Sequence, residues 1–323
     1  MTFGRGFVIV EPMQKVKVAV IGVGHLGSRH LKTYRQLKDS VELIGISDLN
    51  KENGQKLARE YHTVFFPDYR DLIGKVEAVS ICTPTSSHCE VGLACLNAGI
   101  HTLIEKPIAM DVDEADRLVN AARDHNVKLQ VGHIERFNNA FQAIKDIAHD
   151  ALFIECHRLN HFPNRSLDIG VVMDLMIHDI DIVQGLIRQP VADIQAIGIN
   201  VLTDKDDIAN VRLTFANKAV CNLTASRISP EVMRKIRIFI PNAYISLDYV
   251  KQEAFIYSKD GSTITKKSLP IEKEEPLKRE LSHFIECVRD NKTPLVSGIE
   301  GREALKTALA IQKIIWTEHL KKY

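Results

Sequence analysis

The chain has 323 residues, and its 42 Lys and Arg residues nearly balance 41 Asp and Glu residues, which leaves a formal net charge of +1. A charge so close to zero provides no field that would attract nucleic acid or an anionic membrane, so neither is expected as a partner. The sequence contains no apolar run of about 18 residues and its first residues do not read as an export signal, so we expect a cytoplasmic protein without a membrane span.

The six cysteines include no C-x-x-C pair, which argues against a zinc site and against a disulfide framework. We expect no bound metal. At about 150 residues per domain, the length predicts two domains. We place them at residues 14–132 and 133–323, after an N-terminal extension of residues 1–13.

Strands and helices alternate in the first half of the chain. Apolar, β-branched runs predict strands at residues 16–21, 41–47, 78–82, 101–104 and 127–131. Helices are predicted at about residues 26–37, after Asn50, at 87–98 and at 111–125. This alternation is typical of a Rossmann domain, an α/β domain with a parallel, doubly wound sheet.

After about residue 132 the pattern changes to short strands joined by polar turns. Strands are predicted at residues 151–157, 192–201, 209–215, 219–226, 235–240, 244–247 and 253–258. Helices are predicted near residues 170–188, 276–290 and 298–320. The pattern indicates an α+β domain built on one mostly antiparallel, open sheet.

A G-x-G-x-x-G motif formed by Gly22, Gly24 and Gly27 follows the first strand and opens the first helix. In that context the glycines allow a tight turn, the approach of a pyrophosphate and close helix packing. Asp48, at the end of the next strand, can accept hydrogen bonds from a ribose, and its charge favours NAD over NADP. Two alternatives remain: Asp48 only caps the next helix, or the motif belongs to a methyltransferase.

Glu105, Lys106 and Pro107 stand at the carboxyl end of a predicted strand, the sheet edge where ligands bind in open α/β folds. A sharp turn at Pro107, whose peptide bond can be trans or cis, would direct Lys106 inward. A lysine there can take part in proton transfer, although a solvated surface lysine is the ordinary alternative.

Asp174 and His178 are spaced i, i+4, which places them on one face of a helix. Removing a hydride from a carbinol carbon requires a base for the hydroxyl proton, and imidazole is suited to that role. Asp174 is expected to orient His178 or the substrate. The alternatives are a structural role and a metal site with Asp179 or Asp181, which we consider less favoured because those two side chains point elsewhere.

Four motifs in this order, residues 19–27, residues 82–88, residues 105–107 and Asp174 with His178, resemble the Gfo/Idh/MocA family of glucose–fructose oxidoreductase and inositol dehydrogenase. The resemblance covers nearly the whole chain, and the ordered combination is more specific than any single motif. It implies a Rossmann domain joined to an open-sheet domain, and hydride transfer between a nicotinamide cofactor and a sugar or cyclitol hydroxyl.

The resemblance also implies roles for individual residues. Lys106, Asp174 and His178 match the catalytic positions, with His178 as the acid/base. The residues expected to bind NAD are Gly22, Gly24, His25, Leu26, Gly27, Asp48, Thr83, Pro84, His88, Glu105 and Lys106.

Three further segments, residues 132–138, 165–168 and 170–173, are similar to a branch of the family that contains UDP-N-acetylglucosamine 3-dehydrogenases. A nucleotide sugar carries a diphosphate, and arginines near the crevice can bind it through paired hydrogen bonds. We expect Arg136, Arg158 and Arg165 on loops near the crevice, together with Asn138, to bind the substrate. Solvated surface arginines are the alternative.

The sequence therefore predicts an NAD-dependent oxidoreductase that oxidises a secondary hydroxyl of a sugar, with UDP-N-acetylglucosamine C3 as the favoured position. A free-sugar or inositol dehydrogenase is the alternative within the family, and an NAD(H)-binding sensor without turnover is the alternative outside enzymes. Because an open sheet needs cover for one face, a homodimer or homotetramer is expected.

Overall fold

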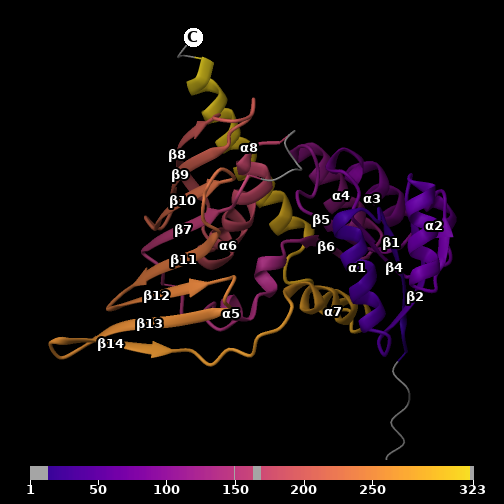
Figure 1. The fold of residues 1–323 in the computed structure, drawn as a ribbon, viewed down its shortest axis with the longest axis horizontal. Coiled ribbons are helices and arrows are strands. Elements are labelled where there is room, and N and C mark those ends of the chain that lie inside the picture. The colour runs from indigo at the N-terminus through magenta and orange to yellow at the C-terminus, as the bar shows by residue number, and fades with distance from the viewer. Residues whose placement is uncertain (1–13, 149, 163–168, 321–323) are drawn as a thin grey trace, which may run out of the picture.

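The computed structural model describes residues 14–148, 150–162 and 169–320, which form two β-sheets side by side (Figure 1). The extension predicted for residues 1–13 lies outside the described residues. The first sheet has six parallel strands in the order β3-β2-β1-β4-β5-β6, and the second has eight strands in the order β14-β13-β12-β11-β7-β10-β9-β8. The predicted fold class, a Rossmann domain plus an α+β domain with a mostly antiparallel sheet, is confirmed.

The first sheet and its helices follow the predicted alternation closely. Its elements are β1 (Val16–Ile21), α1 (His25–Gln36), β2 (Val41–Ser47), α2 (Lys51–Glu60), β3 (Val64–Phe66), β4 (Ala78–Ile81), α3 (His88–Asn97), β5 (His101–Glu105), α4 (Val112–Asp124) and β6 (Leu129–Gly132). The three-residue strand β3 was not predicted, because it is too short to show a periodicity.

Local sequence explains where these elements begin. In β1 only Lys17 is exposed, as expected for a strand covered by helices on both faces. Asn50 accepts a hydrogen bond from the Asn53 backbone N–H at 3.0 Å, and Asp111 accepts one from Glu114 at 2.8 Å, which confirms both helix starts. The strand order reverses between β1 and β4, so a crevice opens at the carboxyl ends of these strands.

The strands of the second sheet are interrupted along the chain by short helical segments. Its elements are the 3₁₀ turn η3 (Ile134–Phe137), α5 (Asn139–Gln142), β7 (Phe153–Leu159), the π-helical turn η4 (Val172–Met176), α6 (Ile177–Ile187), β8 (Val191–Ile199), β9 (Ile208–Phe215), β10 (Val220–Ser226), β11 (Met233–Ile240), β12 (Ala243–Asp248), β13 (Glu253–Asp260) and β14 (Thr263–Ser268). Strands β7 and β10 pair in parallel, and the other pairs of this sheet are antiparallel. Strand β14 was not predicted because all six of its residues are exposed and give no apolar alternation.

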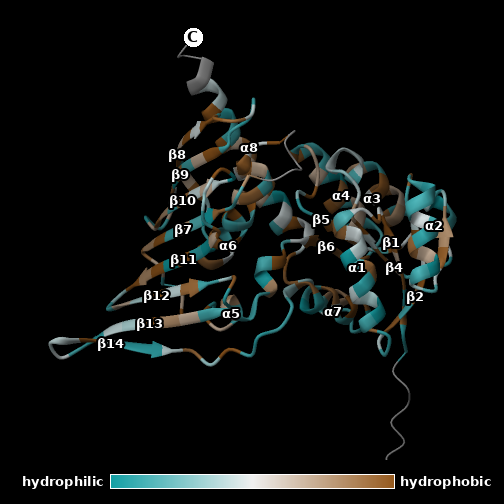
Figure 2. Ribbon diagram, in the orientation of Figure 1, coloured by the Kyte–Doolittle hydropathy of each residue, from teal (hydrophilic) through white to brown (hydrophobic). Residues whose placement is uncertain are grey.

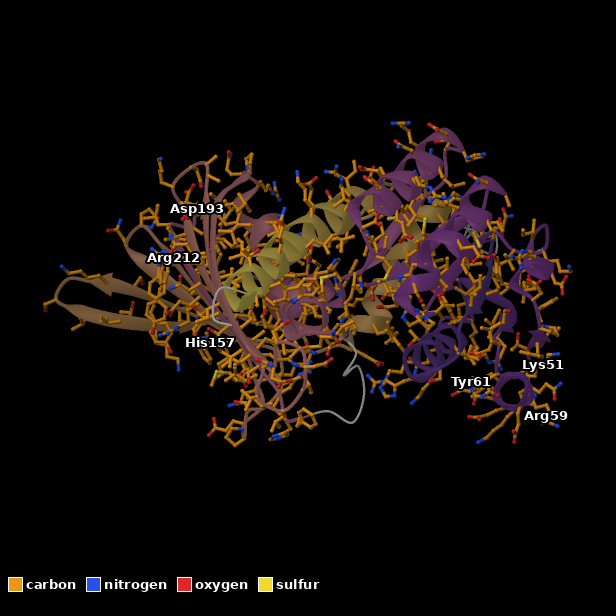
Figure 3. The ribbon with its side chains drawn as sticks, turned by 90° about the horizontal axis from the view of Figure 1, so that it is seen from above. Lys51, Arg59, Tyr61, His157, Asp193 and Arg212 are labelled. Atoms are coloured by element: carbon orange, nitrogen blue, oxygen red, sulfur yellow. The ribbon has the colours of Figure 1, made fainter. Side chains whose placement is uncertain are left out.

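One face of the second sheet is covered and the other is open. Helices α6 and α8 (Gly298–Leu320) pack on the covered face, and buried and partly exposed residues alternate along β7. His157, Asp193 and Arg212 lie on the opposite face, away from α8 (Figure 3). In Figure 2 the apolar residues, coloured brown, are found mainly in the strands and in the helices that pack on them. The sheet is therefore open on one side, as predicted.

Helix α7 (Pro276–Arg289) returns to the first sheet after β14 (Figure 1). Its residues Leu277, Leu281 and Phe284 share one apolar core with Val18 and Val20 of β1. The segment predicted as the second domain, residues 133–323, thus contributes a helix to the core of the first. The two domains are therefore joined by the packing of α7 on β1 as well as by the chain that continues directly after β6.

Candidate active site

The turn between β1 and α1 shows why each motif glycine is needed. Gly22 has a φ of +82°, and a Cβ there would lie 2.8 Å from the Thr83 backbone nitrogen. A Cβ at Gly27 would overlap with the carbonyl oxygen of Gly22, so α1 packs directly on the turn. At Gly24, by contrast, a Cβ would have no neighbour within 4 Å. The amino end of α1 at Gly24 is therefore open to an anionic group.

Asp48 connects the end of β2 to this turn. Its carboxylate accepts hydrogen bonds from the backbone N–H groups of Val23 and Asn50, both at 2.7 Å. The cap of α2 is Asn50, so Asp48 is not merely the residue that caps that helix. Its position at the strand end matches the one from which a carboxylate reaches an adenosine ribose.

A cavity of about 710 Å³ lies along this edge of the sheet. It is lined by residues of the glycine turn, of the end of β2 and of the segment after β4, including Gly22, Gly24, Asp48, Leu49, Thr83 and Pro84. The predicted residues His25 and Leu26 are not part of its lining. Arg70 also lines it, but Asp68 and Glu90 pair with that guanidinium at 3.2 and 3.1 Å, which compensates its charge.

The imidazole of His88 is buried and does not line the cavity. Its Nδ1 lies 2.9 Å from the carbonyl oxygen of Pro107, and its Nε2 lies 2.8 Å from that of Thr83. Burial lowers the pKa of His88, although both carbonyls favour its protonated form. His88 therefore joins two loops of the cavity edge, and it supports Thr83 in the loop that is expected to lie beside the cofactor.

The segment after β5 directs Lys106 across the crevice. The peptide bond between Lys106 and Pro107 is cis, in agreement with the form considered from the sequence. The Lys106 ammonium donates to the backbone carbonyl of Asp174 at 2.6 Å and lies 3.3 Å from its carboxylate. Lys106 is thus tied to the helical segment of the second domain that carries the other predicted catalytic residues.

Glu105 points away from Lys106 into the first domain. Its carboxylate bonds to His30 Nε2 at 2.9 Å and accepts from the Lys106 backbone N–H at 3.2 Å. A Cβ at Gly132 would lie 2.7 Å from this carboxylate, so the glycine of β6 makes room for it. The resemblance implied that Glu105 binds NAD. In the structure its carboxylate anchors the turn that holds Lys106.

Asp174 and His178 lie on a segment that is not a regular α-helix. The sequence predicted one helix at residues 170–188, but η4 is a π turn that leads into α6. The Asp174 carboxylate lies beside Lys106 rather than bonding to His178. The His178 ring is half-buried with its Nδ1 enclosed and unpartnered among the described residues. Burial and the nearby Lys106 hold the pKa of His178 well below its usual value, so the ring is neutral.

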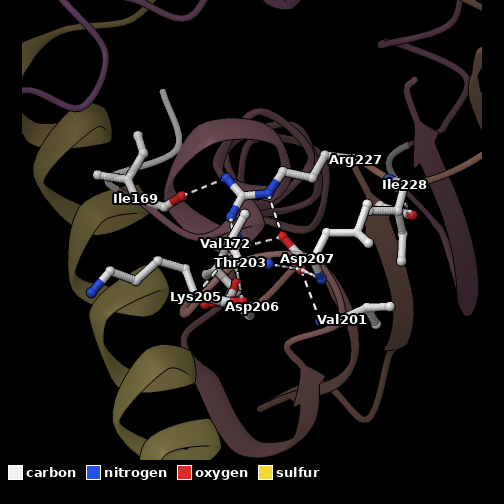
Figure 4. A network of polar contacts seen from close by, with 11 residues as sticks. Ile169, Val172, Val201, Thr203, Lys205, Asp206, Asp207, Arg227 and Ile228 are labelled. Carbon is white, nitrogen blue, oxygen red and sulfur yellow. Dashed lines mark hydrogen bonds and ion pairs between the residues drawn. The ribbon is translucent and has the colours of Figure 1, made fainter. Parts of the chain in front are cut away.

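A buried polar network holds the start of this segment (Figure 4). Arg227 donates to the Ile169 carbonyl at 2.7 Å and to Asp207 at 2.8 Å. The Asp206 carboxylate accepts from the Val172 backbone N–H at 3.2 Å, and a Cβ at Gly170 would overlap with that carboxylate. The β8–β9 connection therefore fixes where η4 begins and, with it, where Asp174 lies.

His133 is a residue that the sequence reasoning missed. It follows β6 directly, so it stands at the same sheet edge as Lys106, and that position was the available signal. Its ring is 1% exposed, neither nitrogen has a partner among the described residues, and it meets the His178 ring edge-on at 6.0 Å between centroids. Burial and Lys106 lower the pKa of His133 to about 3.

The predicted substrate arginines are used inside the protein. Arg158 lies in β7, not on a loop, and its guanidinium bonds to Asp179 at 2.8 and 2.9 Å and to Glu135 at 2.9 Å. Arg136 lies beside Asp181 at a separate cavity of about 680 Å³ between α6 and α8. These positions correct the expectation that both arginines are available on loops near the crevice. Burial of each charge is possible because a carboxylate accompanies it.

Two predicted substrate residues remain, Asn138 and Arg165, and the structure describes only Asn138. Asn138 is buried and donates to the Tyr249 carbonyl at 3.1 Å, so its amide is occupied in packing η3 against β12. Arg165 lies outside the described residues.

The metal alternative finds no support near His178. Within the described parts of the chain, one group of possible ligands is close enough for a metal ion: His30, Cys82 and Glu105. In that group His30 and Glu105 already share a hydrogen bond. Asp179 pairs with Arg158 and Asp181 lies beside Arg136, so neither joins His178 in a shared site.

Comparisons with known proteins agree with this arrangement. Residues 16–133 match the oxidoreductase family with an NAD-binding Rossmann fold, GFO_IDH_MocA, and residues 140–246 match the GFO/IDH/MocA C-terminal domain. The chain is 36% identical to the UDP-N-acetylglucosamine 3-dehydrogenase of Acidithiobacillus ferrooxidans, over 93% of this chain and 97% of that one. The solved structure of that enzyme superposes with a TM-score of 0.89 over 94% of this chain and 98% of that one.

Two further comparisons are more distant. The myo-inositol 2-dehydrogenase of Thermotoga maritima is 26% identical over 92% of this chain and 96% of its own. A levoglucosan dehydrogenase in complex with NADH and levoglucosan is 20% identical, and its TM-score of 0.86 over 94% of this chain and 98% of that chain shows a shared fold. In the described residues no helix is long and apolar enough to span a membrane. The chain belongs to the GFO/IDH/MocA oxidoreductases and carries the NAD-binding Rossmann domain of that family.

Proposed function

We propose that the protein is an NAD-dependent dehydrogenase of a nucleotide sugar, which oxidises the C3 hydroxyl of UDP-N-acetylglucosamine to a 3-keto group. The observation that carries a dehydrogenase activity is the convergence of Lys106, Asp174 and His178 from two domains at the carboxyl edge of the parallel sheet. The choice of substrate rests on the 36% identity with the Acidithiobacillus ferrooxidans enzyme over nearly the full length of both chains.

The residues of the first domain fit NAD. The amino end of α1 is open at Gly24, and the Asp48 carboxylate lies at the end of β2 in the lining of the 710 Å³ cavity. A carboxylate at this position favours a ribose hydroxyl over a 2′-phosphate. Thr83 and Pro84, held by His88, line the same cavity and would bound the cofactor on the side of β4.

When bound, NAD supplies the acceptor for the hydride that leaves the carbinol carbon. Lys106 then donates a hydrogen bond to the substrate hydroxyl and holds its oxygen, while Asp174 anchors the ammonium at 3.3 Å. His178 accepts the hydroxyl proton. Its neutral form is required for that step, and burial together with the charge of Lys106 favours that form by lowering the pKa of His178.

The test is the absorbance of reduced nicotinamide after UDP-N-acetylglucosamine is added to the purified protein with NAD. A coupled aminotransferase that consumes the 3-keto sugar prevents an unfavourable equilibrium from hiding the reaction. Reduction with this substrate, and none with inositol or glucose, is expected. If NAD binds and only inositol or a free sugar is oxidised, the nucleotide-sugar assignment is wrong.

The Lys106→Ala variant tests the assigned roles. Turnover is expected to fall about 10²- to 10⁴-fold because the hydroxyl loses its positioning donor. NAD affinity is expected to stay close to the original value, measured by fluorescence titration. Loss of NAD binding with full turnover would contradict the role given to Lys106. A wild-type protein that binds NAD without turning over any of these substrates would instead support the sensor alternative.

A free-sugar or inositol dehydrogenase is the second candidate, favoured by the inositol dehydrogenases among the relatives at 25 and 26% identity. The two candidates share the same catalytic residues. Only a nucleotide-sugar dehydrogenase needs a site that binds a diphosphate. Inhibition of the reaction by added UDP therefore distinguishes the two candidates. UDP is expected to inhibit a nucleotide-sugar enzyme and to leave an inositol dehydrogenase unaffected.

We place the reaction in the cytoplasm, where the keto group would be aminated for lipid A or another surface glycan. The protein is expected to act as a homodimer or homotetramer. Four aromatic rings, those of Phe153, Phe239, Tyr244 and Tyr257, stack across the open face of the second sheet, and Ile197 is 51% exposed on β8. A second copy would cover this face. Light scattering of the purified protein gives the mass, and a monomer would contradict this expectation.

A further inference from the structure

A substrate with a diphosphate needs cationic or donor groups near the reaction centre, and Arg136 and Arg158 are already paired with carboxylates. Arg234 lies on β11 directly opposite Arg158 of β7. Its charge is the last contributor to the lowered pKa of His178, after burial, Lys106, Arg158 and His133. Arg234 was not singled out by the sequence because nothing in the local pattern of β11 distinguishes it from other arginines.

The guanidinium of Arg234 has no hydrogen-bond or ion-pair partner among the described residues, and its Nε is enclosed. The carboxylates whose charges act on it, those of Glu135 and Asp179, accept hydrogen bonds from Arg158. Burial and the charge of Arg158 lower the pKa of Arg234. Arg234 is a partly buried cation, and an anion that bonds to its guanidinium would gain charge-assisted hydrogen bonds.

Arg234 lines a cavity of about 300 Å³ between the first turn of α1 and the β11–β12 end of the sheet. Arg29 adds a second cation to the lining, and the amino end of α7 adds the positive end of a helix dipole. The acidic residues of the lining are Glu135, which is bonded to Arg158, and Glu275, whose side chain does not cap α7. The cavity shares no lining residue with the 710 Å³ cavity assigned to NAD.

Tyr249 is a second polar residue of this lining that has no hydrogen-bond partner for its side chain among the described residues. Its side chain is 4% exposed and lines the cavity, yet its hydroxyl has no partner among the described residues. Burial raises the pKa of Tyr249 well above its usual value, so the hydroxyl keeps its proton and remains a donor. A buried hydroxyl without a partner is unfavourable. Because it is enclosed, a ligand oxygen in the cavity bonds to it only when the Tyr249 side chain turns toward the cavity.

We propose that this cavity is the site at which the diphosphate of a nucleotide-activated sugar binds, with Arg234 and Tyr249 donating hydrogen bonds to its oxygens and Arg29 at its open side. The proposal rests on the proposed function and adds to it the residues that select for a nucleotide sugar. It also accounts for Leu26, which lines this cavity instead of the NAD cavity.

The experiment measures UDP binding by calorimetry in the full-length protein saturated with NAD. Arg234→Gln is expected to weaken UDP binding at least tenfold, Arg234→Lys to restore part of it, and Tyr249→Phe to weaken it severalfold. Lys235→Gln is the matched control, because Lys235 is the next residue of β11 and its exposed side chain points to the other face. It is expected to bind UDP as the original protein does. Circular dichroism verifies that each variant is folded.

Steady-state kinetics with UDP-N-acetylglucosamine form the second arm. Arg234→Gln is expected to raise KM by a larger factor than it lowers kcat, because the diphosphate is remote from the bond that breaks. If the sugar is oxidised but Arg234→Gln binds UDP like the original protein, the proposed function stands and this site is overturned. If UDP binds through Arg234 but UDP-N-acetylglucosamine is not oxidised, the site stands and the assigned reaction falls.

Two further outcomes would overturn the site. One is an absence of UDP binding to the original protein. The other is UDP binding that disappears when NAD is saturating, since the anion would then occupy the cofactor cavity.

Discussion

Two regions of the molecule were expected to bind phosphate groups: the glycine turn after β1, and the arginines Arg136 and Arg158. In the structure the turn is open to a ligand, whereas both arginines lie beside carboxylates of the protein. At the turn, Gly24 faces open space and the helix end is accessible. At β7, every hydrogen bond that the structure describes for the Arg158 guanidinium goes to Asp179 or Glu135. A phosphate site made of backbone follows from residues close in sequence, because the turn is local. The role of an arginine depends on carboxylates that the fold brings from elsewhere.

The largest effect is expected when the Arg158 charge is removed. Arg158→Met leaves Asp179 and Glu135 buried without their cation, so the free energy of unfolding should fall by about 3–5 kcal/mol. Urea denaturation followed by circular dichroism measures it. Arg212→Met, on the exposed face of β9, is the control and should change stability by less than about 0.5 kcal/mol. A stable Arg158→Met variant that loses only substrate affinity would reverse the comparison and return Arg158 to the substrate site.

The next effect separates two glycines of one turn. Gly27→Ala forces a Cβ against the Gly22 carbonyl, and overpacking of this kind lowers stability by about 1–3 kcal/mol. Gly24→Ala meets no protein atom and should change stability by less than about 0.5 kcal/mol. Its effect should appear instead in NAD affinity, which calorimetry measures. Equal loss of stability in both variants would show that Gly24 is structural and not a cofactor residue.

His133 adds a pH-dependent effect of intermediate size. The unfolded chain protonates this residue below about pH 6.5, whereas the folded protein does so only at about pH 3, so stability is lost as the pH falls between these values. From pH 7 to pH 5 this loss amounts to about 2 kcal/mol. His133→Asn should remove that part of the pH dependence, measured by urea denaturation at both pH values. An unchanged difference between the two pH values would place the proton elsewhere.

The smallest effect concerns the cap of α2, which local sequence predicted. Asn50→Ala removes the acceptor of the Asn53 backbone N–H, and such caps contribute about 1 kcal/mol. Thermal unfolding of the variant beside Asn50→Ser, which keeps an acceptor, measures the difference. Full stability of Asn50→Ala would mean that Asp48 takes over the capping role, and the distinction between these two residues would then fail.

The first domain was predictable because its signals are local. The buried strand β1, the glycines of the turn and the caps Asn50 and Asp111 each act on residues within a few positions of themselves. The second domain was predictable in outline, since alternation along β7 to β13 identifies strands. Its exposed strand β14 and the π turn before α6 escaped prediction, because neither leaves a distinct pattern in the sequence.

The residues proposed to act in catalysis were predicted only in part. Lys106 and His178 were found from the motifs, but the pairing of Asp174 with Lys106 instead of His178 was not. Arg158 and Arg234 lie opposite each other on neighbouring strands, yet Arg158 pairs with carboxylates whereas Arg234 has no such partner in the described parts of the chain. Strand pairing decides such contacts, and the partner residues are many positions apart in the chain.

The amino-acid sequence alone therefore determined the two-domain architecture, the NAD-binding turn and the position of Lys106, because backbone conformation and sheet edges follow from short-range patterns. The folded structure decided which charged side chains bind one another and which remain available to a ligand. The physical reason is desolvation, which makes each buried charge depend on whichever opposite charge the fold places beside it.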